Sequence, residues 1–300
     1  MIDLASLAAL AAEHADDLGR PVAPLLIGDR SYDTDARPVL MSTVNLSRDS
    51  TYRESVAIST ESAIRKARVH VAQGADCVDI GAESSTAKAS RVTPDDQIAA
   101  LLPVVKALAA DDIAVSVEGY DPMVVEAGLQ AGARIVNLTG SAYDDAMFDL
   151  VAAHDATLVL CHVRGANVRE ITDVTRDHDP FPEMLEHFEV RLEQARARGV
   201  ERIVIDPGMG FYYGNLVDPL IRAQHQTMVL LNSFRLRRLG LPICHALPHA
   251  FDLFEDEFRI GEAFFAVLAR LGGTGMLRTH EVPRARAVVE ALARLDTTAP

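Results

Sequence analysis

Polar side chains stand at or just beyond the ends of the apolar segments of this chain, and these residues could do chemistry. In chain order they are Asn45, Asp79, Glu83, Glu118, Asn137, His162, Asp206, His245, Arg278 and His280. Each would cost free energy of folding if it were buried without a partner. Their recurrence predicts a shared binding site; the alternative is that they only satisfy one another and nearby loop amides.

Glu118, Asn137 and Asp206 could hold the edge of a flat heterocycle. The carboxylates offer acceptors, and the amide adds a donor. A buried carboxylate can accept two parallel hydrogen bonds from an N–H group beside an NH2 group. Pterin and guanine rings both carry such an edge, and the residue types do not choose between them.

Asn45, Arg278 and His280 suggest a second subsite, for an anion. They follow the first and last strand candidates of the main sheet, which become neighbours if the sheet closes into a barrel. Two cationic donors and an amide suit a phosphate or a Mg²⁺–pyrophosphate. The strand ends would meet at one open end of the barrel, its mouth. Further side-chain nitrogen atoms are expected near this mouth from His162, Arg164, His245 and His249.

A binuclear metal hydrolase is a weaker alternative for these histidines. The sequence contains no HExxH motif, no HxH after the first strand candidate and no cysteine cluster with ligand spacing.

Eight short apolar runs predict the strands that carry these residues. They are Pro38–Val44, Asp76–Ile80, Ile113–Val117, Arg134–Leu138, Ala156–His162, Arg202–Asp206, Leu241–His245 and Gly275–Thr279. Continuous aliphatic and β-branched runs are typical of parallel strands that are buried on both faces.

Helix signals alternate with these strands. Thr93-Pro94, Asp121-Pro122 and Asp218-Pro219 each read as an N-cap followed by proline at the first helical position. Eight such units predict an α/β fold, a (β/α)8 TIM barrel over residues 37–300, with an N-terminal helix and hairpin over residues 1–36 that cap its bottom. A doubly wound open sheet is the alternative, but no GxGxxG motif follows the first strand.

Composition narrows the class of partner and the location. The formal net charge of −14 disfavours nucleic acid and anionic membranes as partners. Cys77, Cys161 and Cys244 have no CxxC spacing and suggest reduced, buried thiols. The sequence shows no signal peptide and no membrane span, so a cytoplasmic location is expected.

The order of several motifs resembles the dihydropteroate synthases, a family of pterin-binding TIM barrels. These motifs are "VNLSRDS", "GADCVDIGAESS", "AGARIVNLTG", "CHVRG", "IVIDPGMGF" and "LRTHEV", and "DPGMGF" is the most specific. The resemblance covers roughly residues 38–295. It implies condensation of 6-hydroxymethyl-7,8-dihydropterin pyrophosphate with p-aminobenzoate, release of pyrophosphate with Mg²⁺ assistance, and a homodimer formed through the last helices.

The resemblance also assigns roles by position. Asn45 would contact pyrophosphate or Mg²⁺, while Arg278 and His280 would hold the leaving group. Glu118, Asn137, Asp206 and Arg278 would form the pterin pocket. Ser84, Ser85 and His249 would lie on the side of the second substrate.

Several positions depart from the family pattern. Glu118-Gly119 replaces Asp-Thr, Leu138 replaces an aspartate, and Thr86 stands where a loop arginine is expected. The loop that carries Asn45 also differs. Pro248-His249-Ala250 replaces Ser-Arg-Lys, and no Lys or Arg occurs between Leu241 and Glu257. The losses leave three functions open: a transferase with p-aminobenzoate or another nucleophile, a non-catalytic pterin binder, and a pterin-dependent methyltransferase.

Overall fold

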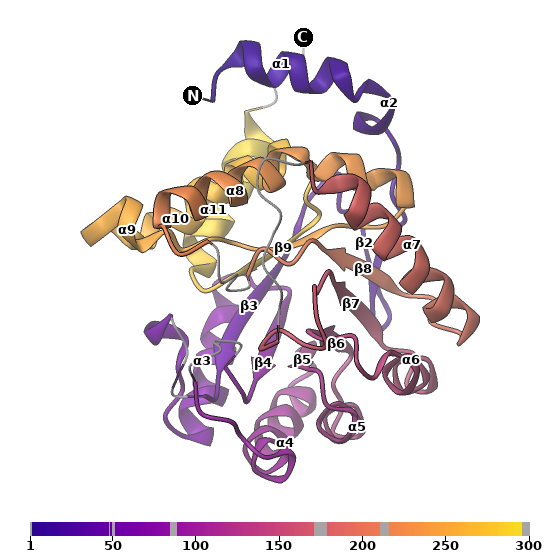
Figure 1. The fold of residues 1–300 in the computed structure, drawn as a ribbon. Helices are drawn as coiled ribbons and strands as arrows, with labels where there is room; N and C mark the ends of the chain where they lie inside the picture. The colour runs from indigo at the N-terminus through magenta and orange to yellow at the C-terminus, as the bar shows by residue number, and fades with distance from the viewer. Residues whose placement is uncertain are drawn as a thin grey trace.

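Eight parallel strands form one curled sheet with helices around it (Figure 1). The structure, a computed structural model, describes residues 2–47, 49, 52–84, 89–170, 179–210 and 216–295. Within these residues, no helix is both long and apolar enough to cross a membrane.

The strands are β1 (Leu25–Ile27), β2 (Arg30–Tyr32), β3 (Val39–Asn45), β4 (Cys77–Gly81), β5 (Val115–Gly119), β6 (Ile135–Leu138), β7 (Thr157–Cys161), β8 (Ile203–Asp206), β9 (Cys244–Ala246) and β10 (Met276–Thr279). The α-helices are α1 (Leu4–Glu13), α2 (Ala15–Leu18), α3 (Thr60–Ala72), α4 (Pro94–Ala110), α5 (Pro122–Gln130), α6 (Asp144–Ala153), α7 (Phe181–Ala197), α8 (Pro219–Asn232), α9 (Phe251–Phe254), α10 (Gly261–Leu271) and α11 (Val282–Arg294). Three 3₁₀ helices are η1 (Arg53–Ser55), η2 (Ser233–Leu239) and η3 (Glu255–Ile260).

The sheet confirms the predicted TIM barrel. Its strand order is β8-β7-β6-β5-β4-β3-β10-β9, so the first and last strands of the barrel, β3 and β10, pair directly. A parallel bridge between Ile205 and Ile243 brings β8 close to β9 and nearly closes the circle. All eight predicted strands are present, with ends that differ by up to three residues from the apolar runs.

Residues that point into the barrel form an apolar plug in its lower part. Successive side chains on a strand face opposite sides, so alternate residues of every strand meet on the axis. Leu25 and Ile27 of the N-terminal hairpin belong to the same buried cluster. The other members include Val39, Met41, Cys77, Ile135, Val159, Val204, Cys244 and Met276. The polar residues near the strand ends lie above this plug.

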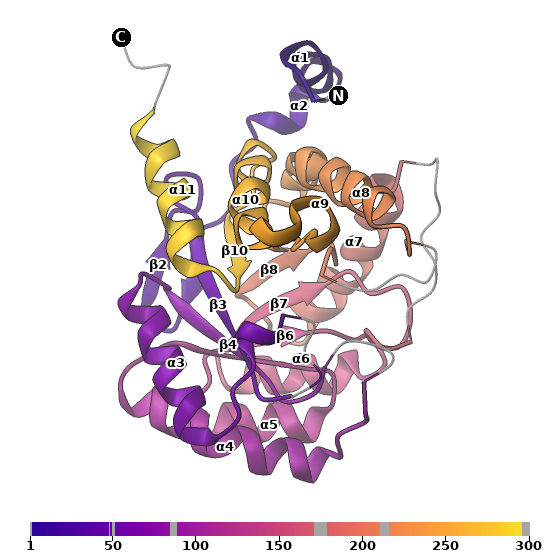
Figure 2. The ribbon, with the colours of Figure 1, turned by 90° about the vertical axis from the view of Figure 1, so that its left-hand side faces the viewer.

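The other face of each strand packs against the surrounding helices. The predicted N-caps are present: side chains of Thr93, Asp121 and Asp218 accept backbone N–H groups at the starts of α4, α5 and α8. Figure 2 shows α10 between α8 and α11 on the outside of the barrel. By contrast, α1 has no buried residue and lies away from the barrel in both views. Cys77, Cys161 and Cys244 are free and buried.

A buried arginine of α7 joins the upper ends of two barrel strands. The guanidinium of Arg191 donates to both carboxylate oxygens of Asp144, at 2.7 and 2.6 Å. It also donates to the carbonyl oxygens of Cys161 at 2.7 Å and Gly140 at 2.9 Å. Removing the guanidinium would leave a carboxylate and two carbonyls without this donor.

We therefore predict that Arg191→Ala lowers the free energy of unfolding by about 3–5 kcal/mol, the usual cost of removing one partner of a buried ion pair. Arg198→Ala, at the C-cap of the same helix, is the matched control. Arg198 pairs with Asp145 and Asp149 at the surface, where such pairs contribute about 0–1 kcal/mol. Urea denaturation of both variants checks the difference. Equal losses would contradict the role assigned to Arg191.

Candidate functional site

The strand register brings the polar residues together at one end of the barrel. Asn45 pairs with Gly81, Gly81 with Glu118, and Glu118 with Asn137, across four neighbouring strands. Gly81 carries no side chain in this row, and a Cβ there would lie 3.4 Å from Oε2 of Glu118. Three of the four positions in this row therefore carry polar side chains, and the fourth is glycine.

Arg278 links several strands through hydrogen bonds to carboxylates. Its Nε donates to Asp79 at 2.7 Å, and its Nη2 donates to Glu118. Asp79 also accepts the hydroxyl of Ser116 at 2.6 Å and Nδ2 of Asn137 at 3.1 Å. The side chain of Asp79 is fully buried, and that of Arg278 is 15% exposed. Together these contacts fix the guanidinium near the barrel axis.

Negative charge exceeds positive charge around this arginine. Burial, together with the nearby Asp79 and Asp206 carboxylates, raises the pKa of Glu118 to about 7 against the attraction of Arg278. Burial also raises the pKa of Asp206 to about 6, although the Gly208 N–H and Arg278 favour its ionised form. Burial alone would lower the pKa of Arg278, but Glu118 and Asp79 raise it above its ordinary value. The arginine stays charged, and the carboxylates compete for it.

The turn after β8 aims Asp206 into this cluster. Oδ1 of Asp206 accepts the backbone N–H of Gly208 at 2.7 Å. Gly208 has a φ of 81°, a backbone region that favours glycine. At Gly210, a Cβ would lie 2.9 Å from Cβ of Ala246, so the backbone passes close to β9. Both glycines of "DPGMG" thus shape the turn that follows the carboxylate.

Asn45 and His280 are positioned by the segment that follows β3. Nδ2 of Asn45 donates to Oγ of Ser55 at 2.6 Å, which fixes the orientation of the amide. The ring of Tyr52 stacks on His280 with centroids 4.5 Å apart. The hydroxyl of Tyr52 donates to Glu281, and burial raises the pKa of this hydroxyl above its usual range. Tyr52 is therefore a neutral platform beneath the imidazole.

A buried glutamate of α10 faces two histidines. One oxygen of Glu262 accepts the hydroxyl of Thr279 and the backbone N–H groups of His280, at 2.9 Å, and Glu281, at 3.2 Å. The other oxygen lies 2.8 Å from Nδ1 of His280 and 3.2 Å from Nδ1 of His249. Burial alone would raise the pKa of Glu262, but the facing histidines lower it.

Two of the expected nitrogen groups do not reach the mouth, and that prediction is wrong. The ring of His162 packs edge-on against His187 of α7, with centroids 4.6 Å apart. His245 is fully buried, and its Nε2 lies 2.6 Å from Oγ of Ser233 at the end of α8. Both point outward because their neighbours in the chain, Cys161 and Cys244, occupy the inward positions.

The loop predicted to approach the second substrate is only partly described. Oγ of Ser84 donates to the carbonyl of Asp49 at 3.2 Å, whereas Ser85 lies outside the described residues. Arg169, from the loop after β7, donates to the carbonyls of Ser84, at 2.8 Å, and Ala89. An arginine from another loop thus joins the two described ends of this segment.

Four residues in or beside the site were not assigned roles from the sequence: Asp79, Glu262, Tyr52 and Arg169. Asp79 carried a usable signal, since a charged residue inside the run "CVDI" needs a buried partner. The other three lie on helices or loops, where their neighbours depend on tertiary packing. The sequence offered no comparable signal for them.

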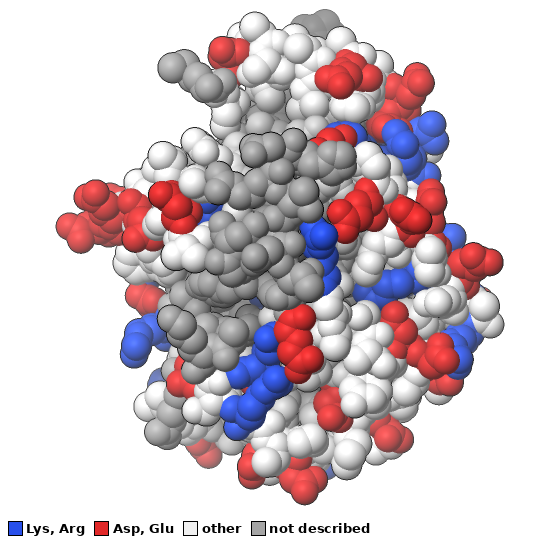
Figure 3. Space-filling view, in the orientation of Figure 1, with Lys and Arg blue, Asp and Glu red and all other residues white. Residues whose placement is uncertain are grey.

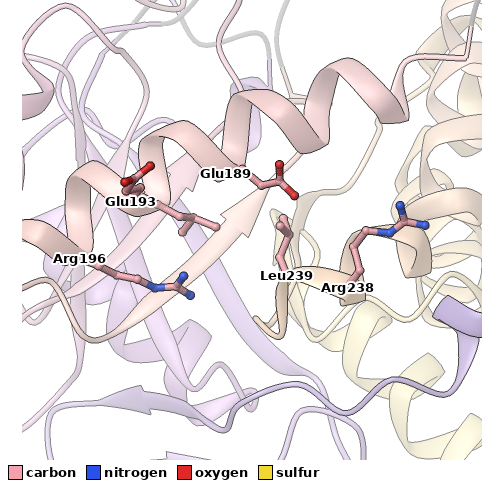
Figure 4. A pocket seen from close by; sticks show the side chains of 6 residues that line it. Glu189, Glu193, Arg196, Arg238 and Leu239 are labelled. Carbon is pink, nitrogen blue, oxygen red and sulfur yellow. The ribbon is translucent and has the colours of Figure 1, made fainter.

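On the face in Figure 3, basic and acidic side chains are interspersed, without a continuous basic patch. A groove between α7 and η2 is lined by Glu189, Leu192, Glu193, Arg196, Arg238 and Leu239 (Figure 4). None of these residues belongs to the strand-end cluster.

Comparison with known proteins relates this site to one family. Residues 41–280 match the family model described as a pterin binding enzyme. The dihydropteroate synthase of Mycobacterium leprae (strain TN) is 34% identical over 244 residues, which cover 78% of this chain and 84% of the relative.

Two solved structures have a similar fold. The dihydropteroate synthase of Xanthomonas albilineans with 4-aminobenzoic acid has a TM-score of 0.76 and 25% identity, covering 93% of this chain and 100% of that chain. The dihydropteroate synthase of Clostridium difficile in the presence of pteroic acid has a TM-score of 0.74 and 25% identity, covering 88% and 99%.

The carboxylate cluster predicts an unusual pH dependence of stability. The pKa of Glu118 in the folded chain, about 7, lies above its ordinary value of 4.5, so the folded chain holds this proton more tightly than the unfolded chain. The contribution of protonated Glu118 to the free energy of unfolding is therefore fully present below pH 4.5 and is lost as the pH rises to about 7. The loss has an upper bound of about 3 kcal/mol.

Glu118→Gln keeps an acceptor for Arg278 but cannot ionise. The free energy of unfolding of the variant, minus that of the unsubstituted protein, should be larger at pH 8 than at pH 5. Urea denaturation at both pH values measures this difference. Glu126→Gln, on the exposed face of α5, is the control and should give the same difference at both pH values. A Glu118→Gln difference that is independent of pH would contradict the assigned electrostatics.

Proposed function

The chain belongs to the dihydropteroate synthase family of pterin-binding enzymes, which are transferases, and from this premise we propose its reaction. The proposed enzyme condenses a 6-hydroxymethyl-dihydropterin pyrophosphate, or a related pterin, with p-aminobenzoate or another nucleophile and releases pyrophosphate. The observation that carries the proposal is the Arg278 cluster. It joins the acceptors for a ring edge to the strand whose last residue His280 follows.

The ring side of the proposed site consists of Glu118, Asn137 and Asp206. Asn137 donates to Asp79 and accepts the thiol of Cys161 at 3.4 Å, so both ends of its amide are already oriented. Each end retains capacity for one further hydrogen bond. The Asp206 carboxylate is buried and the Glu118 side chain is 14% exposed, and an N–H and NH2 edge would satisfy both acceptors.

The anion side of the proposed site consists of Asn45, Arg278 and His280. Arg278 lies on β10, and His280 directly follows the last residue of that strand, Thr279. In the proposed reaction, the bond from the pterin methylene carbon to the pyrophosphate oxygen breaks, and a bond to the amine nitrogen forms. The amine loses a proton, and the pyrophosphate carries away the electron pair of the broken bond. Cationic donors would stabilise the departing anion.

Asn45 fits the Mg²⁺ that the family implies. Its amide nitrogen donates to Ser55, which directs the carbonyl oxygen away from that contact. Mg²⁺ binds oxygen ligands and commonly takes one or two from protein, with the rest from phosphate and water. Asn45 would supply such an oxygen. The bound ion would neutralise charge on the pyrophosphate.

The second substrate is the least constrained part of the proposal. The family lysine is absent, because Pro248-His249-Ala250 stands where the family has Ser-Arg-Lys. The ring of His249 faces Glu262. Arg169 is also near this side, but its Nη1 and Nη2 groups already donate to backbone carbonyls. p-Aminobenzoate is one candidate, and another nucleophile remains in the proposal. Loss of the lysine favours a non-catalytic pterin binder as the second candidate function.

The proposed setting is the cytoplasm, where the three buried thiols would stay reduced. The proposed assembly is a homodimer through the last helices. Exposed apolar side chains of this region, Ile260, Phe264 and Leu271, support it. Sedimentation of the purified chain tests the assembly separately from the reaction.

The reaction is tested by pyrophosphate release from the pterin pyrophosphate in the presence of p-aminobenzoate. We predict that Arg278→Ala lowers kcat by at least about 100-fold, as expected for loss of a donor to a developing anion. Arg286→Ala, at an exposed site on α11, is the matched control and should keep full activity.

Calorimetry with the same pterin separates the two candidate functions. Tight binding of the pterin without release of pyrophosphate, with every nucleophile tried, would identify a binder and reject the transferase. Absence of both binding and release from the folded protein would reject the two together.

A further inference from the structure

The cluster of His249, Glu262 and His280 has the composition of a transition-metal site. Each residue offers one ligand atom, and these atoms lie within 4.8 Å of one another. The three come from separate segments: the loop after β9, the first turn of α10 and the end of β10. We propose that they bind one divalent first-row transition metal ion, through two imidazole nitrogens and one carboxylate oxygen.

The distances suit such an ion. Oε1 of Glu262 lies 2.8 Å from Nδ1 of His280 and 3.2 Å from Nδ1 of His249. With metal–ligand distances of about 2.1 Å, these separations correspond to ligand–metal–ligand angles of roughly 85° and 100°. Both angles are ordinary for neighbouring ligands of a transition metal, and three protein ligands would leave positions open for other ligands.

The two oxygens of Glu262 have different partners: Oε1 shares a hydrogen bond with Nδ1 of His280, which a metal bound to both atoms would replace. Three donors anchor Oε2, namely the Thr279 hydroxyl and two backbone N–H groups. The carboxylate is therefore held in place by contacts that a metal at Oε1 would not disturb. This backing resembles the hydrogen bonds that usually orient a carboxylate ligand.

The ring of His249 supplies the second observation. Its Nδ1 is buried, yet within the described part of the chain it has no hydrogen bond of acceptable geometry. The 3.2 Å contact with Glu262 is close enough but badly directed. A buried ring nitrogen without a hydrogen-bond partner is expensive, and a bound metal would satisfy it.

Aromatic rings enclose the histidines. Tyr52 lies 4.5 Å from the ring centroid of His280 and 4.9 Å from that of His249. Phe251 packs 5.3 Å from His249. Packed rings limit the rotamers of both ligands, so the cluster is organised before an ion arrives.

Imidazole nitrogens favour zinc, cobalt, nickel or iron over Mg²⁺, which prefers oxygen ligands. The site is therefore distinct in ligand chemistry from the Mg²⁺ proposed at Asn45. Metal binding is measured on the chain alone, without pterin. The inference consequently stands or fails separately from the proposed reaction.

The test uses the full chain after chelator treatment. It is titrated with Co²⁺ by visible absorption and with Zn²⁺ by calorimetry. One ion per chain is expected, with visible cobalt bands of nitrogen and oxygen ligation. His249→Ala should weaken binding by at least roughly 100-fold, since changes to outer-sphere partners alone cost about 10–100-fold. His225→Ala, a half-buried histidine of α8, is the control and should bind as the unsubstituted protein does.

Three results would overturn the inference. The first is no absorption and no heat from folded protein. The second is equal metal affinity in the His249→Ala variant. The third is an intense near-ultraviolet cobalt–sulfur band, which would place the ion at a cysteine. Glu262→Gln is a further variant, and circular dichroism checks its folding. If it does not fold, His249→Ala still decides, because that side chain is 22% exposed and its truncation is expected to leave the fold intact.

Discussion

The buried ion cluster around Arg278 is the interaction on which the upper half of the barrel depends. A guanidinium near the axis bonds Asp79 and Glu118, and Asp79 in turn holds Ser116 and Asn137. Breaking such a cluster would leave uncompensated buried charge, so its members are fixed together. The excess of carboxylates leaves acceptors that only an added donor or a proton can satisfy.

This constraint joins the two halves of the proposed reaction. Arg278 donates to the Glu118 acceptor on β5, and His280 follows the end of its own strand. A heterocycle bound at the acceptors and a pyrophosphate bound near His280 would therefore meet at the same guanidinium. Contact at that point would make departure of the anion depend on correct placement of the ring.

Much of the fold follows from local patterns, and less of the site does. Aliphatic runs and Pro-containing helix starts predicted the barrel, because both report on burial and backbone geometry close in sequence. Glu118, Asn137, Asp206 and Arg278 were predicted to meet because they lie at inward positions near strand ends, and the register brings them together. Their roles toward substrate remain predictions.

The histidines show where this reasoning stops. His162 and His245 were expected at the mouth, but strand alternation directs them toward helices. The contact of His249 with Glu262 joins residues of different segments, so no local sequence pattern predicts it. The same holds for Tyr52 on His280, since loop conformation decides which rings meet.

The most direct measurement is a crystal structure of the protein with a dihydropterin and pyrophosphate bound together. The ring edge should lie on Glu118, Asn137 and Asp206, with pyrophosphate on Asn45, Arg278 and His280, and Arg278 in contact with both. A ring bound away from the three acceptors, or pyrophosphate bound without Arg278, would contradict the central role of the ion cluster.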